Sequence, residues 1–170
     1  DAEAAREGAG SFDDPLVDDV VHGLAGPWRE PFDVAVVGDV LEHLPDPERA
    51  LELLRPLLAP EGRLLVSLPN VANVTVRLSL LAGRFAYAER GILDRTHLRF
   101  FTRRTGRRLL ERCGFEVLRE TPTAMPVELA LPSLGRPPLG GSVRALARLL
   151  SFAWPGMFAY QFVFEARPAR

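Results

Sequence analysis

The chain has 170 residues, 47% of them hydrophobic and 25% charged, which is ordinary for one domain with a sizeable core. A formal net charge of −1 excludes a global field that attracts nucleic acid, and the absence of an uninterrupted run of about twenty apolar residues argues against stable membrane insertion. The single cysteine, Cys113, excludes an internal disulfide framework and favours a reducing compartment, so a cytoplasmic location is expected.

The N-terminal third contains one clear strand. Residues 2–7 have the pattern of a helix end, and Leu16 to Val21 that of a short strand. Val34 to Val37 are four consecutive apolar residues, which is typical of a parallel strand buried on both faces. We therefore expect this segment to be a buried parallel strand of an α/β sheet.

A cluster of polar residues follows this strand. Gly38 and Asp39 end the apolar run, and Glu42 and His43 come within one helical turn. Open α/β sheets bind ligands just outside the carboxyl ends of their strands, where small and acidic residues can face a ligand. This cluster of polar residues is therefore the first candidate for a binding site.

Helical spacing of apolar residues begins at Pro47, with Asp46 as the expected N-cap, and continues to Leu58. Pro56 lies inside this pattern and is expected to kink or shorten its last turn. Residues 60–62 (Pro-Glu-Gly) predict a turn. The next buried strand is predicted over residues 63–68 and ends at Pro69-Asn70.

The C-terminal half continues the alternation. Thr102 is the expected cap of a helix through Arg112, closed by Gly114, so that Cys113 is expected to be a buried structural thiol rather than a nucleophile. Strands are predicted over residues 115–120 and 160–166, joined by a proline- and glycine-rich connection with one amphipathic helix around residues 143–152. Strands separated by helices favour a parallel, sheet-centred α/β domain.

Five motifs occur along the chain in a fixed order: Asp18-Asp19, Phe32-Asp33, Leu41-Glu42-His43-Leu44, Pro60 to Asn70, and Gly114-Phe115. Together they resemble class I S-adenosylmethionine-dependent methyltransferases, over roughly residues 1–120. The block from Gly91 to Thr102 is similar to the MetW-like and ubiquinone-type subgroup, which acts on small molecules or glycans.

The resemblance implies a Rossmann-like methyltransferase sheet, mostly parallel, with an antiparallel last strand between strands five and six. Residues 121–157 would then be an acceptor-side insertion between the last two strands. No Gly-x-Gly-x-Gly turn occurs in the chain, although such enzymes open with one. We therefore expect residues 1–170 to form a single partial domain, N-terminally truncated and missing the first two strands, with residues 1–30 as a poorly ordered remnant. Such a fragment is expected to be inactive alone and to bind the cofactor weakly or not at all.

The cofactor implied by the resemblance is S-adenosylmethionine. Asp19 would bind the adenine amino group, with Val20 offering its backbone N–H, and Gly38 would let the backbone pass close to the cofactor. A solvated turn acid and a plain strand end are the alternatives for Asp19 and Gly38.

Asp39 and His43 are expected to line the same pocket. As residues of a helix start, Glu42 and His43 could instead complement the helix dipole. In some ubiquinone-type enzymes the acidic residues and histidine of this motif help to bind a divalent ion, for which Asp39, Glu42 and His43 could serve here. Three mixed side chains within five positions are not a specific metal signature, so no metal is predicted.

His97 is the candidate base for a hydroxyl acceptor, and Asp94 is expected to orient it. The alternative is that residues 94–97 simply form a network of caps and salt bridges. Asn70 is expected on the acceptor side of the pocket. Arg77 and Arg95, with Arg84, Arg90 and Arg99, could bind an anionic acceptor, or form an ordinary solvated face.

The expected reaction is methyl transfer to a small-metabolite or glycan acceptor, through a hydroxyl. The apolar segment 125–158 could cover the sheet edge, or act as a lid or as a surface that meets a lipid-linked acceptor. The rival hypothesis is a non-catalytic, Rossmann-like partner or regulatory module.

Overall fold

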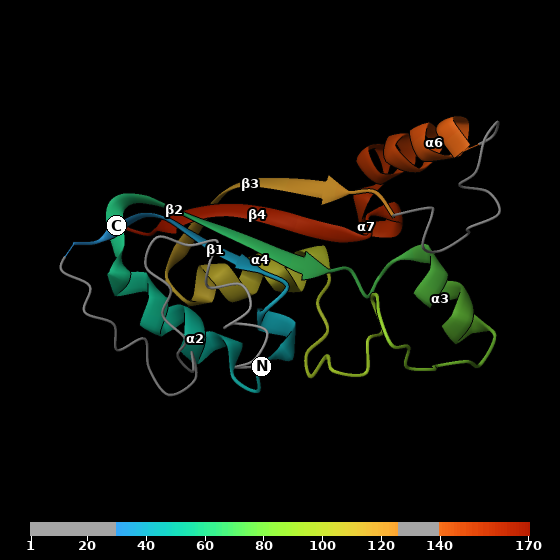
Figure 1. The fold of residues 1–170 in the computed structure, drawn as a ribbon, viewed down its shortest axis with the longest axis horizontal. Coiled ribbons are helices and arrows are strands. Elements are labelled where there is room, and N and C mark those ends of the chain that lie inside the picture. Colours follow the sequence, from blue (N-terminus) through green and yellow to red (C-terminus); the bar gives the residue numbers. More distant parts are fainter. Residues whose placement is uncertain (1–29, 126–139) are drawn as a thin grey trace, which may run out of the picture.

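The computed structural model describes residues 30–125 and 140–170. Its four strands form one sheet in the order β1-β2-β4-β3 (Figure 1). β1 and β2 are parallel, and β4 is antiparallel to both of its neighbours. The predicted mostly parallel sheet, with an antiparallel last strand placed between its two predecessors, is confirmed. The strands are β1 (Phe32–Gly38), β2 (Leu58–Pro69), β3 (Phe115–Thr123) and β4 (Gln161–Pro168).

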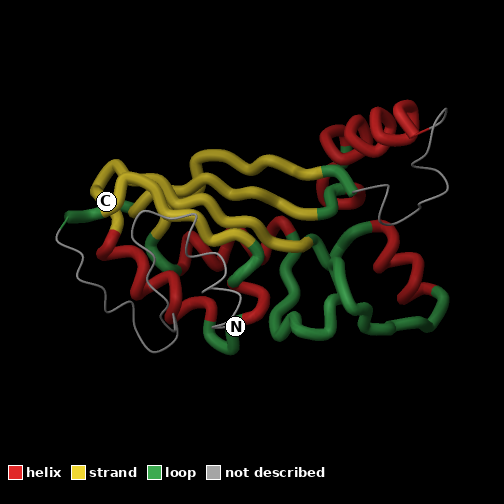
Figure 2. The backbone as a smooth tube through the Cα atoms, in the orientation of Figure 1, coloured by secondary structure: helices red, strands yellow, loops and turns green. Residues whose placement is uncertain are grey.

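Two helices, α2 and α4, lie on the same face of this sheet (Figure 2). The helix α3 stands beyond the carboxyl end of β2, and α6 and α7 lie in the connection from β3 to β4. The α-helices are α2 (Pro47–Leu54), α3 (Val74–Leu81), α4 (Arg103–Arg112), α6 (Gly140–Ala153) and α7 (Pro155–Phe158), and two 3₁₀ turns are η2 (Leu41–His43) and η3 (Arg55–Leu57).

The helix ends follow local sequence signals. The carboxylate of Asp46 accepts a hydrogen bond from the backbone N–H of Arg49, 2.9 Å away, and so caps α2. Pro56 converts the end of that helix into the 3₁₀ turn η3. Thr102 and Thr105 form a capping box at the start of α4, and Gly114, with φ of +79°, follows its end. All three predictions are confirmed.

The core lies between the sheet and the two helices on its face. Alternate residues of β2, namely Leu64, Val66 and Leu68, are buried against this side, and Leu51 of α2 and Leu110 of α4 meet them. Each such side chain contributes roughly 1.5–3 kcal/mol by leaving water. This packing fixes the sheet and therefore the positions of its strand ends.

Two predictions for the sheet were wrong. Val34 and Val36 are 53% and 71% exposed, although burial on both faces was expected for this strand. The helices α2 and α4 pack on the opposite face of the sheet and leave these two side chains uncovered. The turn predicted at residues 60–62 is instead part of β2, where it forms an irregularity: Phe32 pairs with Leu58, but Val34 pairs with Arg63.

Other predictions lie outside the described residues. They concern the helix over residues 2–7, the strand over residues 16–21, and the expected disorder of the first thirty residues. In the ranges that the structure describes, no helix is long and apolar enough to cross a membrane.

Candidate functional site

The carboxyl ends of β1 and β2 lie side by side. Gly38, the last residue of β1, is in register with Ser67 of β2, and Asn70 follows the end of β2. This confirms that the strand ends at Gly38 and Asn70 border the same edge of the sheet. Asp19 and Val20, the other residues predicted here, lie outside the described residues.

Asp39 follows β1 with a φ of +52°, in the left-handed region. Its carboxylate accepts hydrogen bonds from Ser67 Oγ and from Gln161 Nε2, each at 2.8 Å, and its backbone N–H donates to Ser67 Oγ at 2.9 Å. These contacts join the end of β1 to β2 and β4. Asp39 is exposed at the rim where it was predicted, and its role in binding a cofactor stays a prediction.

The loop from Gly91 to Arg99 is hydrogen-bonded to the 3₁₀ turn η2. The backbone carbonyl of Glu42 accepts hydrogen bonds from the N–H groups of Leu98 and Arg99, at 2.8 and 3.0 Å. This attachment brings His97 against His43, with ring centroids 4.8 Å apart in an edge-to-face arrangement. Two histidines that are far apart in the sequence therefore form one group.

Both imidazole rings are held through Nδ1. That of His43 lies 3.2 Å from the carbonyl oxygen of Thr96, and that of His97 lies 3.2 Å from the carbonyl oxygen of Ile92. A carbonyl oxygen only accepts, so Nδ1 carries the proton in both rings. The Nε2 atoms keep their lone pairs, which can take up a proton or bind a cation.

The side chain of Glu42 is 1% exposed, and neither of its carboxylate oxygens has a hydrogen-bond partner among the described residues. Burial raises the pKa of Glu42 to about 7; its own backbone N–H and His43 oppose the rise, and the carboxylate of Asp39 adds to it. An orphaned buried carboxylate beside two imidazoles is unusual for a purely structural role.

Asp94 contacts a different partner from the one predicted. Its carboxylate accepts hydrogen bonds from the N–H and the hydroxyl of Thr96, at 2.8 and 2.7 Å, and these hold the pKa of Asp94 below its usual value. Thr96 Oγ1 also lies 3.1 Å from Nδ1 of His43. Asp94 therefore acts on His43 through Thr96, whereas the ring of His97 is oriented by Ile92. The catalytic role of Asp94 stays a prediction.

Tyr160 was not predicted as a site residue. Burial raises the pKa of its phenol, and the carboxylates of Asp39 and Asp94 raise it further. Gly91, with φ of +101°, approaches so closely that a Cβ there would lie 3.1 Å from the Tyr160 hydroxyl oxygen. A tyrosine at the start of an apolar strand has the pattern of a core residue, so the sequence carried no signal for it.

Asn70 is completely buried. Its amide nitrogen donates to the carbonyl oxygen of Ala159 at 2.9 Å, and its amide oxygen accepts from the N–H of Ala72 at 3.1 Å. Asn73 donates to the same carbonyl of Ala159 at 2.9 Å. The two asparagines hold the turn before β4 against the end of β2, and contact of Asn70 with a substrate stays a prediction.

The two arginines predicted to bind substrate are exposed. Arg77 donates from Nε to the carbonyl of Ala72 at 2.6 Å, and Arg95 forms an ion pair with Glu89. Both lie in the segment beyond the carboxyl end of β2. Their placement fits either a solvated face or a surface for an anionic acceptor.

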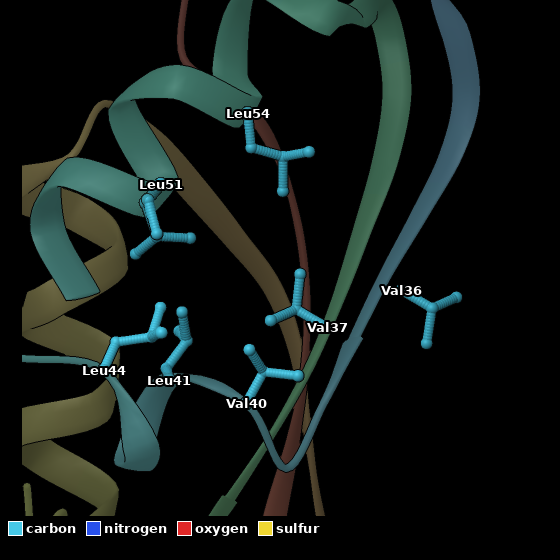
Figure 3. Close-up of a pocket in the computed structure, with 8 residues that line it drawn as sticks. Val36, Val37, Val40, Leu41, Leu44, Leu51 and Leu54 are labelled. Atoms are coloured by element: carbon cyan, nitrogen blue, oxygen red, sulfur yellow. The ribbon is translucent and has the colours of Figure 1, made fainter. Parts of the chain in front are cut away.

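An apolar pocket of about 200 Å³ lies between β1 and α2 (Figure 3). Val37 and Val40 point toward Leu51 and Leu54 across it, whereas Val36 points away (Figure 3). Valine, leucine and alanine make up its whole lining, so it offers no polar group to orient a charged ligand. The cluster of polar residues at the strand ends is therefore a better candidate site than this apolar pocket.

Comparisons with known proteins point to one family. A sequence profile described as a methyltransferase domain matches residues 2–120, which is more than half of the chain. No curated protein sequence matches the chain.

Three solved structures share the fold. One is mitomycin 7-O-methyltransferase MmcR, at 21% identity and a TM-score of 0.56, covering 99% of this chain and 39% of that one. A second is magnesium protoporphyrin IX methyltransferase (ChlM) from Synechocystis PCC 6803 with bound SAH, at 16% identity, a TM-score of 0.52, and coverage of 99% and 57%. The third is a SAM-dependent methyltransferase from Archaeoglobus fulgidus, at 15% identity, a TM-score of 0.55, and coverage of 89% and 66%. The chain thus spans less than two thirds of the first structures' own length, and at these identities the likeness concerns the fold.

Proposed function

The chain belongs to the methyltransferase domain family, and from this premise we propose that it transfers a methyl group from S-adenosylmethionine to a hydroxyl of a small metabolite or glycan. The observation that carries the proposal is the group of Glu42, His43 and His97 at the carboxyl edge of the sheet. In open α/β folds this edge is where a nucleoside cofactor and its reaction partner meet.

The donor needs little chemical help from the protein. Its sulfonium carries the methyl group, and the protein chiefly aligns the acceptor oxygen behind the methyl carbon. As the new C–O bond forms, the C–S bond breaks and S-adenosylhomocysteine leaves. The hydroxyl proton must go to a base in the same step or before it.

His97 is the base in this proposal. Its Nδ1 proton is held by the carbonyl of Ile92, so Nε2 presents a lone pair that can accept the hydroxyl proton. Asp94 acts indirectly. Its carboxylate accepts a hydrogen bond from the Thr96 hydroxyl, which also contacts His43, and the His43 ring lies against that of His97.

The cofactor in this proposal lies along the strand ends. Gly38 lets the backbone approach it, and Asp39 and His43 border it, as the neighbouring ends of β1 and β2 support. Asp19 and Val20 complete the adenine side. Assignment to the MetW-like subgroup is part of the same proposal.

The acceptor lies beyond the end of β2 in this proposal. Asn70 shapes that side, and Arg77 and Arg95 attract an acceptor with a phosphate or carboxylate, including a lipid-linked one. A cytoplasmic location is proposed because Cys113 is buried and unpaired.

The test uses the longest product of the coding sequence that contains these residues. We expect calorimetry to show S-adenosylmethionine binding, and radiolabelled donor to show transfer to hydroxyl acceptors. His97→Gln is expected to lower kcat by about 10²–10⁴-fold without changing cofactor affinity. Arg104→Gln, an exposed change on α4, is the matched control and should leave both unchanged. Absence of both binding and transfer would support the rival hypothesis of a non-catalytic partner module.

A further inference from the structure

The helix α6 presents an apolar face to solvent. Leu146, Leu149 and Phe152 are each more than half exposed, and their spacing of three residues places them on one side of the helix. The other side is attached to the rest of the chain: Ser151 is buried, and its hydroxyl oxygen lies 3.0 Å from the carbonyl oxygen of Phe158. A surface helix usually directs such apolar residues to the core, so this face is available to a partner.

Trp154 extends this apolar face. It follows the end of α6, is more than half exposed, and its ring centroid lies 6.2 Å from that of Phe158 at the end of α7. We call Leu146, Leu149, Phe152 and Trp154 the outer face. In Figure 1, α6 lies beyond the end of β3, at the periphery of the molecule. Large exposed apolar side chains gathered in this way mark a surface that binds a protein or a membrane.

The charge around the outer face is basic. Residues 129–164 contain no aspartate or glutamate, although the whole chain has a net charge of −1. Arg144 and Arg148 are both exposed and lie one turn apart on α6, at the margin of the outer face. The guanidinium carbon of Arg148 lies 6.0 Å from the centroid of the Phe152 ring. A surface that carries negative charge is therefore complementary to this helix.

A basic groove of about 380 Å³ adjoins the outer face and shares Phe152 with it. Arg103 of α4 and Arg119 of β3 contribute to its lining. Glu120 also lines the groove, but its carboxylate is paired with Arg103 and Arg107, so the groove keeps an excess of positive charge. Guanidinium groups bind phosphate through two parallel hydrogen bonds. The groove therefore offers a phosphate headgroup a place next to the apolar side chains.

From these features we propose that α6 lies in the surface of a bilayer that contains anionic lipids. The outer face is then buried at the boundary between headgroups and acyl chains, and the arginines of α6 and of the groove meet the phosphates. Tryptophan favours this depth because its ring is apolar while its N–H stays near water. The exposed side of a helix is convex, and a fluid bilayer surrounds such a ridge without the matching groove that a protein partner must supply.

The proposal goes beyond methyl transfer and does not depend on it. In Figure 1, α6 and the carboxyl end of β2 lie at the same end of the molecule. Docking through the outer face therefore brings the candidate site close to molecules dissolved in the bilayer. Membrane binding needs neither donor nor acceptor, so it is measured without them.

The experiment is co-sedimentation of the 170-residue chain with sucrose-loaded vesicles, made of phosphatidylcholine alone or of phosphatidylcholine mixed with phosphatidylglycerol. Binding to the mixed vesicles is expected to be at least about tenfold stronger, because each arginine near an anionic surface strengthens binding about fivefold. A higher salt concentration should weaken it, because salt screens these charges. Equal binding to both kinds of vesicle, or binding to neither, would overturn the proposal.

Trp154 reports how deeply the outer face enters the bilayer. The chain has two tryptophans, and Trp28→Phe leaves Trp154 as the only one. On mixed vesicles the emission of Trp154 should shift to shorter wavelength and be quenched by lipids with brominated acyl chains, because its ring leaves water. Sedimentation without this quenching would mean that another surface binds the vesicles, and would count against the proposal.

Leu149→Glu should weaken binding to the mixed vesicles at least about tenfold, because it puts a negative charge on the outer face. Leu81→Glu is the matched control: it makes the same charge change at an exposed leucine of α3 and should leave the affinity nearly unchanged. Arg148→Gln should weaken binding to the mixed vesicles about fivefold without affecting the weaker binding to phosphatidylcholine alone. Circular dichroism checks that each variant keeps the fold.

A loss with Leu81→Glu as large as that with Leu149→Glu would contradict the assignment to α6. So would a chain that binds no vesicle but forms a dimer that Leu149→Glu dissociates, since the outer face would then contact a second copy of the chain. Vesicle binding without methyl transfer would leave the proposal standing and count against the proposed function alone.

Discussion

The carboxylate of Asp39 accepts a hydrogen bond from the side-chain amide of Gln161, 2.8 Å away, and so joins β1 to β4, which are not neighbours in the sheet. Ser67 of the intervening β2 donates to the same carboxylate. One side chain therefore fixes three strand ends relative to one another, directly beside the candidate site.

Asp39→Ala is expected to lower the free energy of unfolding by about 1–3 kcal/mol, because it removes both hydrogen bonds and puts alanine at a φ of +52°. Asp39→Asn should cost less, since asparagine tolerates this conformation and can still accept hydrogen bonds. Urea unfolding measures both. Asp33→Ala, at an exposed acid on the same strand, is the control and should change stability by less than about 0.5 kcal/mol. If Asp39→Ala changes the free energy of unfolding as little as this control does, the contacts of Asp39 with Ser67 and Gln161 are not needed for stability.

The ion pairs of Glu120 should make stability depend on pH in the acid range. Its side chain is 5% exposed, and burial opposes its ionisation, but hydrogen bonds from Arg103 and Arg107 outweigh burial and lower its pKa from 4.5. The unfolded chain therefore takes up this proton first as the pH falls. The contribution to stability is complete above pH 4.5 and is lost as the pH falls through the lowered pKa of the folded state.

Glu120→Gln should remove this part of the pH dependence and cost about 1–3 kcal/mol at neutral pH. Urea midpoints measured from about pH 7 to about pH 3 check both effects. Glu52→Gln, at an exposed helix acid, is the comparison and should retain the parental profile. If both variants follow the same curve as the parent, another carboxylate is responsible.

Replacement by alanine is expected to have opposite effects on stability at two helical glycines, because their surroundings differ. A Cβ at Gly106 of α4 would lie 3.0 Å from Leu68 and 3.1 Å from the ring of Phe164, both in the core, whereas one at Gly141 of α6 would meet nothing within 4 Å. Gly106→Ala should therefore destabilise the chain by about 1–3 kcal/mol. Gly141→Ala should stabilise it by about 0.4–1 kcal/mol. Thermal unfolding compares the two, and a stabilised Gly106→Ala would mean that the core can yield at this contact.

The thiol of Cys113 should resist alkylation. It is 6% exposed, and burial, helped by the carboxylates of Glu48 and Glu52, raises its pKa to about 11, so the thiolate is scarce at neutral pH. We expect iodoacetamide to react with the folded chain at pH about 8 far more slowly than with the urea-unfolded chain. Mass spectrometry of the time course gives both rates. Equal rates would show that the helix end opens freely.

Much of the fold could be predicted because it depends on local signals. Asp46 before Pro47 and Thr102 before α4 are caps that act within one turn, and the strand order came from a family resemblance. The exposure of Val36 was missed because an apolar run does not say which of its faces another element covers.

The site was harder to predict because it depends on long-range contacts. His43 and His97 were each singled out, but nothing in the sequence shows that the carbonyl of Glu42 holds the loop that brings them together. The orphaned carboxylate of Glu42 is likewise a property of packing, because the same residue in an exposed helix would be solvated. The hydrogen bonds from Thr96 to the carboxylate of Asp94 were not expected, because three-residue spacing between Asp94 and His97 does not reveal the intervening hydroxyl.

The position of β4 has a consequence for synthesis of the chain. β4 separates β2 from β3, so within residues 30–125 and 140–170 β3 has no hydrogen-bonded neighbour in the sheet until Gln161–Pro168 leaves the ribosome. At about 5–20 residues per second this interval lasts roughly a few seconds, during which two strand edges stand open to other nascent chains. Early termination within Gln161–Pro168 should therefore yield aggregates rather than a smaller soluble domain.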